Sequence, residues 1–150
     1  MLADNTIREV LGLHSKGPLL PTSLMHEVEK GLPLTALDRV AKAVAPDDAQ
    51  FAFRMVSRAT LARRRKALSM ARHAATARLS ADESARVARL AGVWALAREV
   101  WGSDEEARAF LFRPHPILEG RRPVDVVLAN EFGRPLVEGL LGRLQYGSAA

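Results

Sequence analysis

An apolar seam with helical spacing is the feature that most constrains how this chain folds. Its residues recur at alternating intervals of three and four positions: Val87, Leu90, Trp94, Ala97 and Trp101. This spacing places all five side chains on one face of an α-helix. Ser80 and Glu83 precede the seam as a capping box, and Gly102 follows it. The sequence therefore predicts one long helix from about Ser80 to the residue before Gly102.

The same period runs through most of the chain, and no convincing alternation of polar with β-branched or aromatic residues interrupts it. Ala, Leu, Arg and Glu, which are strong helix formers, dominate the sequence. We therefore expect an all-α fold.

Start and stop signals divide the N-terminal half into short helices. We expect helices over residues 6–13, over 22–30 with Thr22 or Ser23 as cap, and from a Thr35 cap to Pro46. Asp47 or Asp48 is expected to cap a helix that reaches about Met55, and Ser57 is expected to cap the next one.

The C-terminal half carries similar signals. A second capping box, Ser103 with Glu106, opens a helix that Pro114 and Pro116 end. Pro123 occupies a first-turn position for a helix over residues 124–130. Gly133 is expected to break the chain before a last amphipathic helix over residues 136–144.

Basic residues are concentrated in the middle of the chain. The protein has 22 Lys and Arg against 17 Asp and Glu, a net charge of +5. The window from Arg54 to Arg89 holds ten basic and two acidic residues, so its net charge is +8 and the remainder carries −3. Such a distribution suggests that this segment faces a polyanion.

The start of the basic window overlaps the last helix of a candidate helix-turn-helix over residues 34–66. In that motif the second helix lies in the major groove, where hydroxyl and guanidinium groups near its N-terminus reach phosphates and bases. Arg72 is a further candidate phosphate contact. The other interpretation of the same helix is a solvated basic face. The candidate DNA-binding residues are Ser57, Arg58, Thr60, Arg63, Arg64, Arg65 and Lys66.

The seam and the chain end also have two interpretations each. The seam either forms the core of its own domain or provides the dimer interface that a palindromic DNA site requires, and a central helix can do both. The tail from Tyr146 to Ala150 is either a frayed terminus or a segment that threads into a cleft of a partner.

Several classes of function are excluded or unsupported. The chain has no cysteine, so disulfides, thiolate zinc sites and cysteine nucleophiles are impossible. No apolar run approaches the roughly 18–20 residues that span a bilayer, and the start lacks the pattern of a signal peptide, so we expect a cytoplasmic protein. We find no catalytic motif, cofactor fingerprint or metal-ligand spacing, the latter judged on His14, His26, His73 and His115.

Five fragments in order resemble the Xre/MbcA/ParS antitoxins of RES-type toxin–antitoxin systems. They cover the chain from about Leu34 to Gly147. The fragments are residues 60–64 (TLARR), 79–90 (LSADESARVARL), 97–102 (AREVWG), 116–125 (PILEGRRPVD) and 133–147 (GRPLVEGLLGRLQYG). Two positions depart from the family pattern: residues 54–56 lack the usual glycine of the turn, and Glu119 stands where a small residue, often glycine, is usual.

The resemblance implies a non-enzymatic antitoxin without cofactor. Residues 1–33 would be an N-terminal extension, residues 34–78 an Xre-like helix-turn-helix that binds the operator of its own operon, and residues 79–150 a helical toxin-binding domain. RES toxins attack NAD or transfer ADP-ribose from it, and such antitoxins block the NAD cleft with their C-terminal end. By that analogy the toxin-binding residues are Leu141, Arg143, Leu144, Tyr146, Gly147 and Ser148.

The leading hypothesis is therefore a homodimeric antitoxin that neutralises a RES-domain toxin and represses its operon. The alternative is a stand-alone DNA-binding regulator whose C-terminal domain serves only dimerisation. An all-α enzyme is the third hypothesis, and it lacks an assembled site.

Overall fold

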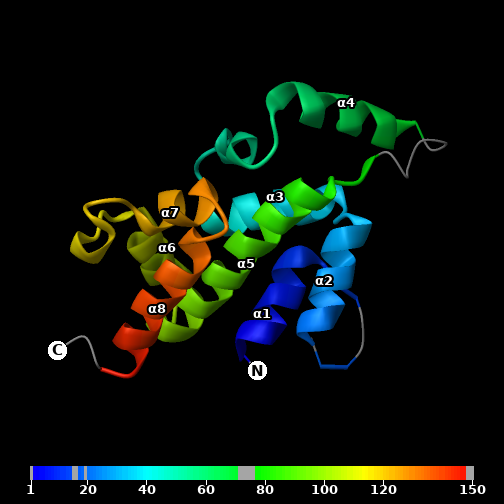
Figure 1. The fold of residues 1–150 in the computed structure, drawn as a ribbon. Coiled ribbons are helices and arrows are strands. Elements are labelled where there is room, and N and C mark those ends of the chain that lie inside the picture. The colour runs from blue at the N-terminus through cyan, green and yellow to red at the C-terminus, as the bar shows by residue number, and fades with distance from the viewer. Residues whose placement is uncertain (1, 15–16, 19, 71–76, 148–150) are drawn as a thin grey trace. The chain divides into compact units, whose positions relative to one another are not determined.

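A computed structural model describes residues 2–14, 17–18, 20–70 and 77–147, and its regular structure is entirely helical (Figure 1). This confirms the all-α expectation. In chain order the elements are α1 (Leu2–Leu11), α2 (Pro21–Lys30), α3 (Leu34–Val44), the 3-10 helix η1 (Phe51–Arg54), α4 (Arg58–Ser69), α5 (Ala81–Trp101), α6 (Asp104–Phe112), the 3-10 helix η3 (Pro116–Leu118), α7 (Pro123–Ala129) and α8 (Gly133–Gln145).

The chain divides into two compact units. The basic unit comprises Arg8–Ala88, and the C-terminal unit comprises Arg89–Ala150 together with Met1–Ile7. Both boundaries fall inside helices, so α1 and α5 each contribute to two units.

The core of the basic unit is built around α3. Its residues Leu37, Val40 and Val44 are fully buried, as expected from their helical spacing, and Phe51 and Leu61 pack into the same unit from η1 and α4. The segment just before α5 is joined to the segment just after α2 by a backbone hydrogen bond. The Leu79 N–H donates to the Leu32 carbonyl at 2.8 Å. Gly31 permits this approach because its φ is +93° and an added Cβ would lie 2.5 Å from the Leu79 carbonyl oxygen.

The C-terminal unit packs α6, α7 and α8 with the second part of α5, and its buried side chains include Trp94, Leu111 and Leu141. The prediction that Gly133 breaks the chain is wrong: Gly133 is the first residue of α8. Its missing side chain serves packing, because an added Cβ would lie 1.8 Å from the Val126 carbonyl oxygen of α7.

The predicted caps at Ser57, Ser80 and Ser103 are confirmed. Ser57 accepts from the Thr60 N–H, Ser103 accepts from the Glu106 N–H, and Ser80 and Glu83 bond each other's backbone as a capping box. As expected, α5 ends before Gly102, and Pro123 occupies the first turn of α7.

The caps predicted at Thr22, Ser23 and Thr35 are wrong, because α2 and α3 begin one or two residues earlier and have no side-chain cap. Pro21 explains why α2 begins there without a side-chain cap, because its φ is preset for a helix and it has no N–H that needs a partner. The first helix likewise begins four residues before the expected Thr6.

The helix predicted from Asp47 or Asp48 to Met55 is also wrong. Only the short 3-10 helix η1 forms there. Asp48 acts locally instead, and its carboxylate accepts from the Gln50 N–H at 2.9 Å in a turn.

Candidate functional site

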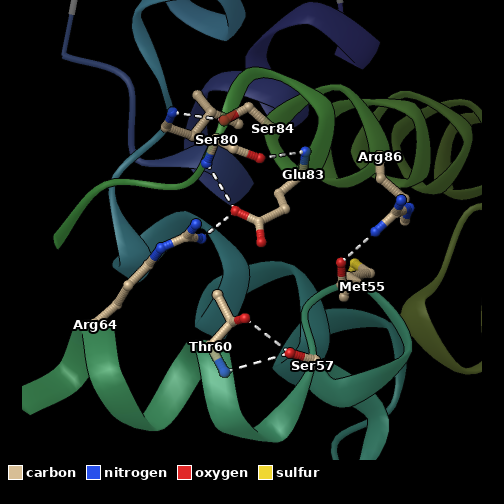
Figure 2. A network of polar contacts seen from close by, with 9 residues as sticks. Met55, Ser57, Thr60, Arg64, Ser80, Glu83, Ser84 and Arg86 are labelled. Atoms are coloured by element: carbon tan, nitrogen blue, oxygen red, sulfur yellow. Dashed lines mark hydrogen bonds and ion pairs between the residues drawn. The ribbon is translucent and has the colours of Figure 1, made fainter. Parts of the chain in front are cut away.

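The N-terminus of α4 is organised by two hydroxyl groups. Ser57 has an extended backbone (φ −62°, ψ 152°), and its Oγ accepts from the Thr60 N–H at 3.3 Å. The Ser57 hydroxyl also lies 2.9 Å from the Thr60 hydroxyl (Figure 2). The predicted Ser57 and Thr60 thus fix the start of the helix.

Helix α4 is almost entirely a surface helix. Leu61 is its one buried residue, and it anchors the helix to the core of the basic unit. Arg63 and Lys66 are exposed to solvent, and Arg58 stacks over the Phe53 ring at 4.1 Å from the ring centroid. The helix thereby presents a cationic surface over one apolar anchor.

Two of the predicted DNA-binding arginines are held by carboxylates of the same unit. Arg64 pairs with Glu83, and both side chains are only 16% exposed (Figure 2). Arg65 pairs with Asp38 of α3 at 2.9 Å, where both side chains are about half exposed. Arg64 therefore holds α4 against the start of α5, while Arg65 remains accessible beside its partner.

Glu83 links α4 to the capping box of α5. Its carboxylate accepts from the Ser80 N–H at 2.7 Å as well as from Arg64. Burial acts to raise the pKa of the Glu83 carboxyl, but the bonds from Ser80 and Arg64 outweigh it and hold the pKa below its ordinary value. One carboxylate thus serves as helix cap and as ion-pair partner.

Two further bonds hold α5 in the basic unit. The buried Ser84 hydroxyl accepts from the Leu32 N–H at 2.9 Å, and Arg86 donates to the Met55 carbonyl at 2.5 Å, in the turn before α4 (Figure 2). Sequence reasoning missed Asp38, Phe53 and Arg86 as supports of α4. The partners of Asp38 and Arg86 are distant in sequence, so no local spacing could have indicated these two contacts.

The turn before α4 does not need the glycine that is usual in the family. Met55 has a φ of −104°, which any residue adopts. Arg72 and His73 lie outside the described residues.

The predicted toxin-binding residues fall into different environments. Leu141 is fully buried in the core of the C-terminal unit, so its side chain cannot contact a partner without unfolding; we correct its assignment to a core residue. Arg143, Tyr146 and Gly147 are exposed, and Leu144 is partly exposed. Ser148 lies outside the described residues.

Sequence reasoning missed the exposed apolar residues of the C-terminal unit. Ile117, Phe132 and Leu136 are 55%, 73% and 60% exposed. Two hollows among the described residues of this unit differ in lining. One lies beside Trp101, Phe110 and Leu144, and the other lies between η3 and α8, lined by Ile117, Leu118, Glu119, Arg121, Val126, Leu136, Leu140 and Arg143.

The seam of α5 is largely internal. Val87, Leu90, Trp94 and Ala97 are buried within the chain, whereas Trp101 is 37% exposed and packs on Phe110 at 6.0 Å between ring centroids. Trp101 is the seam residue that remains accessible to a partner.

Within the described residues, His, Asp and Glu side chains nowhere gather in a group of three that could hold a metal ion. Nor is any helix of the described part long and apolar enough to cross a membrane.

The arrangement of α3, η1 and α4 with a capped, cationic last helix is that of a helix-turn-helix, and a second helical unit follows it. Comparison with known families agrees. Residues 23–92 match the antitoxin Xre-like helix-turn-helix domain, and residues 96–147 match the antitoxin Xre/MbcA/ParS C-terminal toxin-binding domain. The protein is an antitoxin of the Xre family with a helix-turn-helix domain and a toxin-binding domain.

These matches imply a toxin and DNA as partners, and the two families are generally non-enzymatic. A search of curated proteins found no relative of this chain.

Proposed function

We propose that the protein neutralises a RES-domain toxin, which degrades NAD or transfers ADP-ribose from it, by placing its C-terminal end in the NAD cleft. The observation that supports this most directly is Tyr146, which follows the last residue of α8 with 80% of its surface exposed. A phenol ring offers a stacking face to a nucleotide site, and the exposed Arg143 one turn earlier can pair with carboxylates there.

Truncation after Gln145 tests this mechanism. The full-length and truncated antitoxins are each co-expressed with the RES-domain product of the adjacent reading frame, and cellular NAD is measured. We expect the truncated protein to remain helical and to bind the toxin in a pull-down, while NAD falls to the level of cells without antitoxin. Gln145→Ala, which keeps the tail, is the matched control and should protect NAD fully. Equal protection by the truncated protein would exclude the tail from the mechanism.

We further propose that the helix-turn-helix represses the protein's own operon, with residues 34–78 contacting the operator and residues 79–150 the toxin. The exposed Arg63 and Lys66 and the exposed Ser57 cap of α4 support phosphate and base contacts. Binding to a fragment of its own promoter, measured by fluorescence anisotropy across a salt series, should weaken steeply as salt rises. An affinity that does not change with salt would show that this surface is a solvated face, and autoregulation would then be excluded.

A homodimer in the cytoplasm completes the proposal. Paired half-sites require a two-fold protein, and both an operator and NAD are met in the cytoplasm. Because four seam residues are buried, the dimer contact must use other surfaces, and Trp101 is the one seam residue available to it. Light scattering at micromolar concentration tests the dimer, and a monomeric mass would contradict it.

A further inference from the structure

The hollow beside Trp101 is mostly apolar and lies along one face of α6. Its volume is about 590 Å³. Four of its lining residues share that face, because they follow at helical intervals of three, one and three: Glu106, Ala109, Phe110 and Arg113. Trp101 borders the hollow from the end of α5 and is 37% exposed. Because tryptophan is enriched where protein surfaces meet, its exposure beside an apolar hollow indicates an interface.

Charges of opposite sign stand at the two ends of this hollow. Glu106 lies in the first turn of α6, and Arg113 follows its last residue. They are about 10 Å apart along the helix, beyond the single turn at which side chains of one helix pair. Within the described residues, the side chains of Glu105, Glu106 and Arg113 form no ion pair, whereas the preceding Asp104 pairs with Arg98. The chain thus leaves charges of both signs unpaired along one face.

The order of these residues makes the face complementary to itself. Ala109 and Phe110 lie midway between Glu106 and Arg113 in the sequence. If a second copy is turned by 180° about an axis through this midpoint, the two α6 helices become antiparallel. Glu106 of each copy then lies opposite Arg113 of the other. Ala109 is small and exposed, so the two helices can approach to about 8 Å, the lower end of helix–helix distances.

We propose that this face of α6 is the homodimer interface and that its occupant is a second copy of this chain. The two hollows face each other across the two-fold axis and bury the exposed surface of Trp101 and Ala109 between the copies. Two pairs of Glu106 with Arg113 close the ends of the contact. The inference rests on the homodimer of the proposed function and names its contact. It uses no residue of α4 or of the tail.

Exchanging the two charges tests the contact in the full-length protein. Glu106→Arg and Arg113→Glu each place like charges opposite one another at both ends of the interface. Each variant should therefore raise the dissociation constant of the dimer about 100-fold or more, measured by sedimentation equilibrium over a dilution series. An equimolar mixture of the two variants should form a heterodimer, because every arginine again meets a glutamate. Glu99→Arg, the same change at an exposed residue of α5 that does not line the hollow, is the matched control and should stay dimeric.

Ala109→Arg tests the centre of the contact, because it places a long charged side chain at the two-fold axis. It should keep its helicity and be monomeric, alone and in either mixture.

The outcomes separate this contact from the rest of the proposed function. Recovery of the dimer on mixing supports the interface, because two misfolded variants could not restore each other. Variants that stay dimeric would overturn it and leave a homodimer that uses another surface. If they also lose the RES-domain product of the adjacent reading frame in a pull-down, the hollow belongs to the toxin. A monomeric unaltered protein would overturn both the interface and the homodimer, while neutralisation of the toxin would still stand.

Discussion

Helices α4 and α8 are of similar length, yet the chemical character of their exposed side chains differs. Helix α4 buries Leu61 alone and covers its outside with arginine and lysine. Helix α8 buries Gly133, Val137, Leu140 and Leu141, and leaves Phe132 before it and Leu136 within it exposed. Charge distinguishes the first surface already in the sequence, because charged side chains almost never lie in a core. The second surface consists of residues that could equally belong to a core, so packing alone reveals it.

The largest expected effect tests whether these two surfaces belong to separable units. Gly133→Ala would force a Cβ to within 1.8 Å of the Val126 carbonyl oxygen, so α7 and α8 must move apart. We expect it to destabilise the C-terminal unit by about 3 kcal/mol or more, at the upper end of overpacking effects. Thermal unfolding by circular dichroism should show this loss, and toxin binding should be abolished.

DNA binding is the second readout of the same variant. Gly133 lies outside the basic unit, so promoter binding by Gly133→Ala should survive below its lowered unfolding temperature. Loss of both activities at a temperature where the protein is folded would contradict the division of labour between the two surfaces.

Glu83 provides the next effect, confined to the DNA-binding side. Glu83→Gln removes the charge that pairs with Arg64 and weakens the cap of α5, which should lower the free energy of unfolding by about 1–3 kcal/mol. Because folding lowers the pKa of this carboxyl, its contribution is present above the ordinary value of 4.5 and is lost as the pH falls through the lowered pKa.

Urea unfolding at pH 7 and at several acidic pH values measures both consequences. The difference between the original protein and Glu83→Gln should be largest at pH 7 and should shrink as the pH falls below 4.5. A difference that stays constant with pH would show that the carboxylate charge is not what stabilises this contact. Toxin affinity at pH 7 should not change.

The comparison also shows what the sequence could predict. Capping boxes and helical spacing located α5 and α6 closely, because both depend on residues three or four positions apart. The pairing of Arg64 with Glu83, the contact of Gly133 with Val126 and the burial of Leu141 depend on residues brought together by packing. Local patterns carry no signal for such contacts, so the sequence alone could not indicate that Arg64 is paired or that Leu141 is buried.

Arg63 and Arg64 are neighbours with the same charge, and they should respond differently to substitution. Arg63 is exposed, so Arg63→Ala should reduce the slope of log affinity for promoter DNA against log salt by about 1 without loss of stability. Arg64 is 16% exposed and paired, so Arg64→Ala should lower the unfolding temperature and leave the salt slope nearly unchanged. Equal reductions of the slope would mean that Arg64 leaves Glu83 to contact DNA.

The smallest expected effect is the sharpest test of the α8 surface. Gly139→Ala adds a Cβ in open space within a helix, and alanine is favoured over glycine there by about 0.5–1 kcal/mol, so the antitoxin should become slightly more stable. If the toxin lies against this face, the same methyl group should weaken its binding several-fold, measured by calorimetry. Gln145→Ala, which adds no Cβ to α8, controls for the altered composition of the helix. Stability gained with no change in affinity would show that the partner does not approach α8 at Gly139.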